Sequence, residues 1–231
     1  MLSQLRNQIS QIKGGSQLRA LLERSQYRAH VGCNDVAVPG YVNVDVRSTR
    51  ATDLVHDCKD LSIFPDESLA FVFSNAFFEH LYVPQRLPFL KDLHRTLKAD
   101  GWAAFTGLPD FEEVARAYLE RRRPGHVSPE FDLSEVYRYS HGAPEGRANW
   151  WLAQLHKGLL DSRTLSSLLV EAGFASHCVF RYCWGNEPYP INIAFLASKS
   201  PKPLDPSQPE IRELLSSLPT NINFQTLAVC S

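Results

Sequence analysis

The pattern of apolar positions predicts alternating strands and helices from Tyr27 onward. Seven short β-rich runs, mostly bounded by Gly, Pro, Asp or Asn, are predicted at 28–33, 41–46, 52–56, 69–75, 102–108, 174–183 and 191–198. Apolar residues recur at helical spacing over 84–99, where one face carries Leu87, Leu90, Leu93 and Leu97, and Asp100-Gly101 follows as a stop signal. Two further helices are expected, over 110–122 with an Asp110 cap and over 161–172 with Gly173 at its end.

This alternation indicates an α/β fold. Strands separated by helices favour a doubly wound, mainly parallel seven-stranded sheet with helices on both faces. The last two runs are joined by the tight turn WGNEPYP, so we expect an antiparallel pair at one edge of the sheet.

Three regions follow from the same pattern. Residues 1–26 carry leucines and isoleucines at helical spacing, interrupted by Gly14-Gly15, and are predicted as an N-terminal helical segment. The main domain is placed at 27–199, with a variable insertion at 123–156 whose first part, 123–146, lacks a period and is expected to act as a lid. Residues 200–231 begin with a linker composition and are predicted as a tail with one helix near 209–217.

Composition and charge narrow the class of protein. The chain has 231 residues, 44% hydrophobic residues and a formal net charge of −1, so no global field favours nucleic acid or an acidic membrane. Its five cysteines are odd in number and contain no C-x-x-C pair, which suits a reducing compartment. Neither a signal peptide nor a run of about 18 apolar residues is present, so we expect a cytoplasmic protein without a membrane span.

The stretch HVGCNDVAVPGYVNVDV, residues 30–46, admits two interpretations. Only about seven residues separate its two β-runs, whereas parallel strands usually need a crossover of a dozen or more, so a surface hairpin is the better local prediction. The alternative is the wall of a nucleotide-type pocket, with Gly32 ending one strand and Asp45 the next.

Polar or small residues follow several of the predicted strands. They are Gly32, Asp45, Asp57, Asn75 and Asp110. Ligands in open α/β sheets bind outside the carboxyl ends of the strands, so we expect these residues to share one rim. Asp45 could accept two hydrogen bonds from a ribose diol, and Asp57 could accept one from an exocyclic amine.

Several stretches between residues 29 and 110 resemble a known family. They are HVGCN, PGYVNVD, DLVHDCKDLSIFPDES, FSNAFFEHL and LHRTLKADGWAAFTGLPD. They resemble the class I S-adenosylmethionine-dependent methyltransferases, in particular the type 11-like group whose first motif reads GCG…PGY-x-N-x-D. HKGLLDSRTLSSLLVEAGF resembles the late helix of the same family, so the resemblance covers roughly 29–198.

The resemblance implies a Rossmann-like fold, an S-adenosylmethionine cofactor and a set of cofactor-binding residues. Gly32, Cys33 and Asn34 would form the loop near the methionine moiety. Asp45, followed by Val46, would bind the ribose, and Asp57 and Cys58 would flank the adenine. Ser74 and Asn75 would lie beside the sulfonium. The resemblance also favours the pocket over the hairpin, because members of this group have a shortened first crossover.

Three positions depart from the family pattern and leave two functions open. Asn34 stands where the family has its second glycine, His30 where many members have an acid or amide, and Ala70 where an Asp is frequent. The leading hypothesis is a methyltransferase acting on a small-molecule or saccharide-type acceptor. The alternative is a catalytically inactive, methyltransferase-like binding module.

The candidate catalytic residue is His80, just beyond the fourth predicted strand. Methyl transfer is accelerated largely by positioning, and a base is needed only if the acceptor must lose a proton. His80 could take that proton, whereas its neighbour Glu79 is expected to accept structural hydrogen bonds. Other titratable candidates are Asp110, His141 and His156. No metal is expected, because His, Asp and Glu do not recur at metal-ligand spacing.

Overall fold

A computed structural model describes residues 15–125, 128–142 and 154–230 of the chain. The predicted helical pattern from Leu2 to Ile12 lies outside these residues, as does part of the predicted insertion. Residues 15–24 are helical, as expected. Among the described residues, no helix is both long and apolar enough to cross a membrane.

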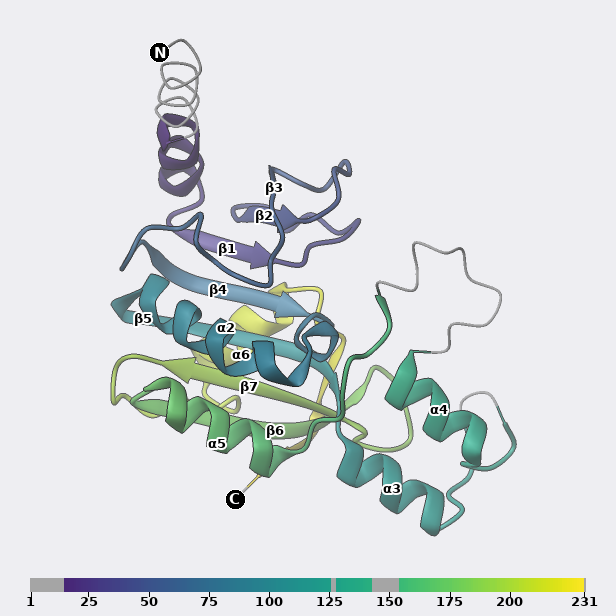
Figure 1. Ribbon diagram of the computed structural model, residues 1–231. Coiled ribbons are helices and arrows are strands. Elements are labelled where there is room, and N and C mark those ends of the chain that lie inside the picture. Colours follow the sequence, from purple (N-terminus) through teal and green to yellow (C-terminus); the bar gives the residue numbers. More distant parts are fainter. Residues whose placement is uncertain (1–14, 126–127, 143–153, 231) are drawn as a thin grey trace.

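The core of the fold is a single eight-stranded sheet with the order β3-β2-β1-β4-β5-β7-β6-β8 (Figure 1). The strands are β1 Arg28–Val31, β2 Val42–Asp45, β3 Leu54–Val55, β4 Leu69–Asn75, β5 Leu97–Pro109, β6 Ser176–Trp184, β7 Asn192–Ser198 and β8 Ile222–Val229. β1 to β5 are parallel to one another, and β7 is antiparallel to both β5 and β6. The mainly parallel, doubly wound sheet is therefore confirmed.

The edge of the sheet differs from the prediction. β6 and β7 are the expected antiparallel pair, but β8 lies outside β6 and forms the edge. The segment expected as a tail thus supplies an eighth strand as well as the predicted helix α6, Pro209–Ser217. β8 is half-exposed along most of its length and lacks the clean alternation that marks a strand with one buried face.

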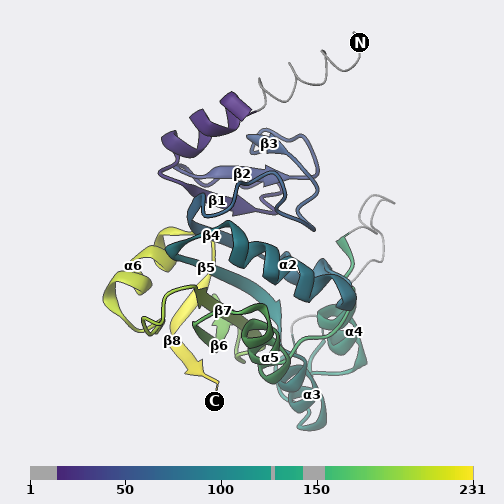
Figure 2. The ribbon, with the colours of Figure 1, turned by 60° about the vertical axis from the view of Figure 1, so that its left-hand side comes forward.

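Helices cover both faces of the sheet. α2, Val83–Thr96, and α5, Ser162–Ala172, pack on one face together with helical residues 15–24, and α6 packs on the other (Figures 1 and 2). Neighbouring residues on β4 alternate between these layers: Val72 joins the core beneath α2 and α5, and Phe73 joins the core beneath α6.

Helix boundaries follow their capping residues. The Asp110 carboxylate accepts the Glu112 backbone N–H and starts α3, Phe111–Leu119, as predicted. α5 begins after Asp161 and ends at Gly173, whose φ of 95° suits glycine. α2 ends at Thr96, earlier than predicted, because Leu97 is buried and pairs with Leu69 at the start of β5.

The segment 123–146 contains an element that was not predicted. α4, Leu133–His141, begins at Asp132, whose side chain accepts the backbone N–H groups of Ser134 and Glu135. It ends at Gly142 with a φ of 87°. The cap and the terminal glycine were legible in the sequence, but the few apolar positions between them gave a weak helical period.

The hairpin interpretation of residues 30–46 is wrong. β1 and β2 are parallel, with Ala29 opposite Val42 and Val31 opposite Val44. The crossover, residues 32–41, contains no helix. The Asn43 side chain holds this crossover in place of a helix. Its Oδ1 accepts the Val38 N–H at 2.8 Å, and its amide donates to Asp53 Oδ2 at 2.9 Å.

His30 completes this buried network. Its Nδ1 lies 3.1 Å from Asn43 Oδ1, its ring stacks on Phe73, and its side chain is 2% exposed. Burial lowers the pKa of His30 from 6.5 to about 4, against smaller opposing effects of Asn43 and Asp45. The imidazole is therefore neutral in the folded protein near neutral pH.

This burial predicts an acid-sensitive fold. In the unfolded chain His30 takes up a proton below pH 6.5, whereas in the folded protein it does so only near pH 4. The free energy of unfolding therefore falls as the pH falls from 6.5 to 4, and His30 does not affect it above pH 6.5. His30→Gln keeps an amide donor for Asn43 and removes the proton. Denaturant unfolding should show that the wild type loses about 2 kcal/mol more than the variant between pH 7 and pH 4.5. Parallel pH profiles would contradict this account.

Candidate active site

A cleft of about 710 Å³ lies at the carboxyl ends of β1, β2 and β4. This main cleft falls within the range of roughly 300–1,000 Å³ typical of small-molecule sites. Most of the predicted site residues line it: Gly32, Cys33, Asn34, Asp45, Val46, Asp57, Cys58, Asn75 and His80. Ser74 does not line it, because its hydroxyl donates to the Val31 carbonyl at 2.7 Å inside the sheet.

Gly32 brings bare backbone to the surface of the main cleft. Its φ is 71°, a conformation that L side chains rarely adopt. A Cβ at this position would lie 2.9 Å from Phe77 Cδ2. Both the backbone conformation and the nearby ring therefore require glycine.

Asp45 is the buried anion of the main cleft. It is 8% exposed, and its two oxygens accept the backbone N–H groups of Asn34 and Arg47, each at 2.8 Å. A carboxylate has about four lone-pair sites, so both oxygens retain acceptor capacity for a ligand.

Asn34 adopts the left-handed conformation that a glycine would otherwise supply, with a φ of 50°. Its exposed side chain accepts a hydrogen bond from the Arg47 guanidinium outside the turn. The departure from the glycine pattern therefore leaves the turn intact. At the other end of the rim, Asp57 is exposed and pairs with Lys59 Nζ at 2.9 Å.

The two cysteines of the main cleft are protonated thiols. Burial raises the pKa of Cys33 to about 11 and that of Cys58 to about 12. The Cys58 thiol donates to the Val44 carbonyl at 3.6 Å. Neither group is therefore a nucleophile near neutral pH, because the thiolate is the reactive form.

Asp110 does not share the rim with the other strand-end residues, contrary to the prediction. β5 is 13 residues long, so it carries Asp110 beyond the main cleft. There the carboxylate caps α3 and pairs with the Arg181 guanidinium, which also reaches Glu112 at 2.6 Å. Its role is structural. His141 likewise lies outside the main cleft and bonds to the Ser140 hydroxyl.

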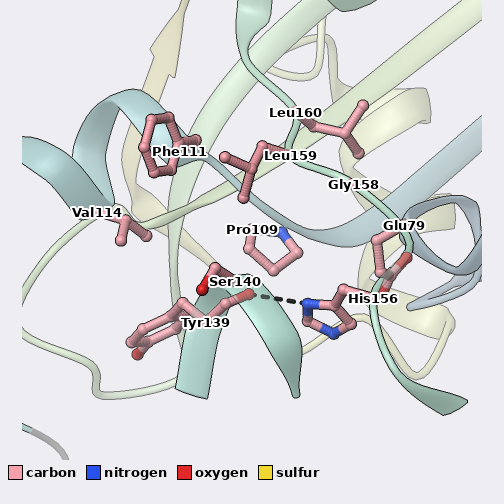
Figure 3. A pocket seen from close by; sticks show the side chains of 10 residues that line it. All are labelled: Glu79, Pro109, Phe111, Val114, Tyr139, Ser140, His156, Gly158, Leu159 and Leu160. Atoms are coloured by element: carbon pink, nitrogen blue, oxygen red, sulfur yellow. Dashed lines mark hydrogen bonds between the residues drawn. The ribbon is translucent and has the colours of Figure 1, made fainter. Parts of the chain in front are cut away.

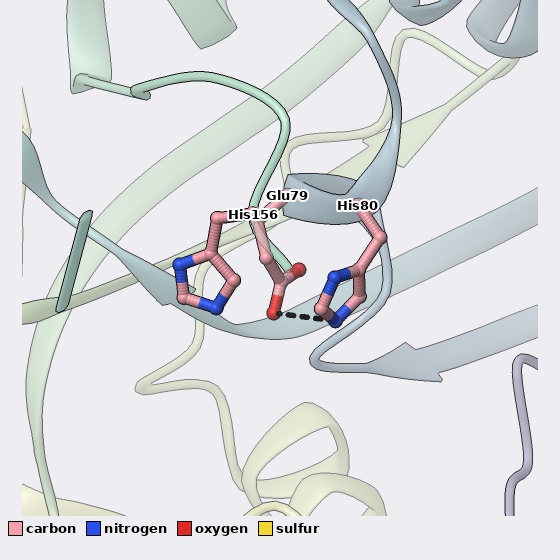
Figure 4. Close-up of side chains that lie close together, drawn as sticks. All are labelled: Glu79, His80 and His156. Atoms are coloured by element: carbon pink, nitrogen blue, oxygen red, sulfur yellow. Dashed lines mark ion pairs between the residues drawn. The ribbon is translucent and has the colours of Figure 1, made fainter. Parts of the chain in front are cut away.

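A second group of titratable side chains adjoins the main cleft. Glu79 and His80 lie on η1, Phe78–His80, directly after β4, and His156 comes from the segment after α4 (Figure 4). The His80 Nε2 to Glu79 Oε1 distance is 3.8 Å, and one ligand atom from each of the three residues lies within 4.8 Å of the others. We call these three residues the histidine cluster.

Backbone carbonyls orient both imidazoles of the histidine cluster. His80 Nδ1 lies 3.2 Å from the Leu155 carbonyl, and His156 Nδ1 lies 2.8 Å from the Tyr139 carbonyl (Figure 3). A carbonyl only accepts, so each Nδ1 carries the proton and each neutral ring keeps a lone pair on Nε2. Burial lowers the pKa of both histidines.

Glu79 is the buried acid of the histidine cluster. It is 2% exposed, and burial raises its pKa to about 7. Its Oε2 has no hydrogen-bond partner among the described residues. Glu79 and His156 also line a small cavity of about 10 Å³, beside Pro109 and Tyr139, which is about the room that one water needs (Figure 3).

Part of the chain matches a known family. Residues 14–105 match a family model described as "Methyltransferase domain". These residues include β1 to β4, η1 and the rim of the main cleft. This part of the chain is therefore similar to methyltransferase domains, in agreement with the resemblance seen in the sequence. A comparison with curated proteins finds no match.

The chain is similar in fold to a solved methyltransferase structure. A SAM-dependent methyltransferase from Archaeoglobus fulgidus is 14% identical, with 81% of this chain and 93% of that chain covered and a TM-score of 0.51. A possible histamine N-methyltransferase from Thermotoga maritima is 14% identical, with 80% and 91% covered and a TM-score of 0.47. Identities this low bear on the fold alone.

The main cleft fits S-adenosylmethionine, the cofactor that the resemblance to methyltransferases implies. The bare backbone at Gly32 leaves room for close approach, and the Asp45 carboxylate keeps lone pairs for a diol. Sequence reasoning missed Phe77, Tyr82 and Lys157 in the lining. It also missed that His156 meets Glu79, because no local spacing connects residues so distant in sequence.

Proposed function

We propose that this protein is an S-adenosylmethionine-dependent methyltransferase that transfers a methyl group to a hydroxyl of a small-molecule or saccharide-type acceptor. The observation that carries the proposal is that one cleft joins Asp45, Asn75 and His80. A carboxylate suited to a ribose thus shares a cavity with an imidazole lone pair suited to an acceptor.

The methionine and ribose of the cofactor lie at the ends of β1 and β2 in this proposal. Gly32, Cys33 and Asn34 border the methionine moiety, and Asp45 accepts the ribose hydroxyls with Val46 beside it. This assignment is supported by the position of all five residues in the cleft and by the lone pairs that Asp45 retains.

The adenine and sulfonium ends complete the cofactor assignment. Asp57 and Cys58 flank the adenine. When the cofactor binds, the Asp57 carboxylate leaves Lys59 and accepts a hydrogen bond from the exocyclic amine of the adenine. Asn75 borders the sulfonium, and its Oδ1 is held by the Thr106 hydroxyl at 2.8 Å. Ser74 acts only from inside the sheet.

The acceptor end lies around His80. Bound S-adenosylmethionine supplies an electrophilic methyl group, whose bond to sulfur breaks, leaving its electrons on sulfur, as the bond to the acceptor oxygen forms. The His80 Nε2 lone pair accepts the hydroxyl proton, which then passes to water. Its Nδ1 contact with Leu155 fixes the direction of that lone pair.

Polar and aromatic groups near His80 support a hydroxylated acceptor. Tyr82, Gln154 and Lys157 line the same cleft, and Lys157 Nζ lies 5.7 Å from the Tyr82 ring centroid. Gln154 belongs to the predicted insertion 123–156, to which we assign the choice of acceptor. The net charge of −1 argues against a nucleic-acid acceptor.

The cofactor assignment predicts the effect of Asp45→Asn. The variant replaces the charged acceptor with a neutral amide. Hydrogen bonds to a charged group contribute about 1.5–3 kcal/mol to the binding free energy, so S-adenosylmethionine should bind at least tenfold more weakly in calorimetry. The matched control is Asp57→Asn, at an exposed carboxylate, which should have a smaller effect. Equal affinity of Asp45→Asn and wild type would remove Asp45 from the cofactor site.

The acceptor assignment is tested by turnover. Methyl transfer from labelled S-adenosylmethionine should be followed across hydroxylated small molecules and mono- and oligosaccharides. With a substrate that is methylated, His80→Ala should lower kcat at least 100-fold, because general acid–base catalysis contributes about 10²–10⁴-fold to a rate. The affinity of the variant for S-adenosylmethionine should stay within severalfold of that of the wild type. Unchanged kcat would show that His80 does not act on the acceptor, and transfer only to amines would contradict the proposed hydroxyl.

A further inference from the structure

The histidine cluster presents three electron-rich atoms to one another. Because both Nδ1 atoms bond to carbonyls, the two Nε2 atoms and the Glu79 carboxylate meet as lone pairs. In Figure 4 the carboxylate lies between the two imidazole rings. A buried carboxylate oxygen with no donor costs free energy, and Glu79 Oε2 has none among the described residues.

The neighbouring cation, Arg86, acts on Glu79 through its charge but makes no hydrogen bond to the carboxylate. The nearest buried guanidinium, that of Arg86, donates to the carbonyls of Leu81, Gly158 and Leu159. Its hydrogen bonds thus hold the segment that carries His156 rather than the Glu79 carboxylate. Among the described residues, no side chain therefore donates a hydrogen bond to Glu79 Oε2.

The orientation of the two histidines matches that of metal ligands. Histidines that bind a metal almost always donate their other ring N–H to a carboxylate, carbonyl or water, which fixes the tautomer and directs the lone pair. His80 and His156 both do so through backbone carbonyls, at 3.2 and 2.8 Å.

We propose that Glu79, His80 and His156 bind one divalent transition-metal ion of the zinc class. Two imidazoles and one carboxylate suit Zn²⁺, whereas Mg²⁺ and Ca²⁺ prefer oxygen ligands. Ligand atoms about 2.1 Å from a tetrahedral ion lie roughly 3.4 Å apart. The present separations, 3.8 Å for one pair and at most 4.8 Å for all, therefore require side-chain rotations that close the cluster by about 1 Å.

The proposed ion borders the acceptor end of the main cleft. His80 lines that cleft, so an ion bound at its Nε2 would lie beside the cleft, and a ligand could take its fourth coordination position. This inference rests on the proposed function and replaces the role of His80 as base in the metal-bound protein: there the His80 lone pair would hold the ion, and the ion rather than the imidazole would contact the acceptor hydroxyl. A coordinated hydroxyl has a lower pKa, which favours loss of its proton to water.

Metal binding is tested without an acceptor. The full chain, stripped with chelator, is titrated with Zn²⁺ by calorimetry and with Co²⁺ by visible absorption. We expect one ion per chain, a tetrahedral Co²⁺ spectrum without thiolate charge-transfer bands, and a rise in melting temperature that chelator reverses. Glu79→Gln and His156→Gln should each weaken Zn²⁺ binding at least tenfold, and His177→Gln, at a histidine on β6, should not.

Three results would overturn the proposal. They are equal Zn²⁺ affinity of wild type and His156→Gln, a Co²⁺ spectrum with thiolate bands, or no metal-dependent melting shift in the unmodified protein. The last needs no variant to fold. S-adenosylmethionine calorimetry on the metal-free wild type separates the two proposals, because retained cofactor binding without metal binding would refute the ion and leave the methyltransferase assignment intact.

Discussion

The constraint on which the structure depends is the short parallel crossover between β1 and β2. Residues 32–41 are too few for the usual helix, so side chains of β2 satisfy the polar backbone of the crossover. Asn43 binds Val38, and Asp45 binds the N–H of Asn34. These two β2 residues alternate with apolar ones and therefore point to the same face of the strand. The carboxylate that closes the crossover is also the one proposed to bind the ribose, so fold and cofactor site share one network.

The other half of the site depends on a distant segment of the chain. Arg86 on α2 is buried and donates to the carbonyls of Gly158 and Leu159, which anchors the segment after α4 against the sheet. The Lys157 N–H then donates to the Glu79 carbonyl at 2.9 Å, and His156 reaches the carboxylate of the same residue. Through these contacts the insertion brings His156 to the cluster that begins on η1, beside the proposed acceptor end of the main cleft.

Local signals predicted the parts of the fold that depend on local physics. Asp110, Asp161 and Gly173 cap helices as their residue types suggest, and the left-handed turn at Asn34 follows from its tolerance of positive φ. Contacts between residues far apart in the sequence were harder to predict. β8 is half-exposed and lies beyond a linker-like stretch, Asp110 is carried past the rim by a long strand, and His156 meets Glu79 only in three dimensions. The parallel crossover needed the family resemblance, because its length alone favours a hairpin.

The central claim is that the main cleft binds S-adenosylmethionine through a network built into the first crossover. Isothermal titration calorimetry of the unmodified chain with S-adenosylmethionine and with S-adenosylhomocysteine tests it most directly. The account predicts one site per chain for both compounds, with a negative heat-capacity change from burial of apolar surface. The absence of saturable binding for both compounds in folded protein would contradict it.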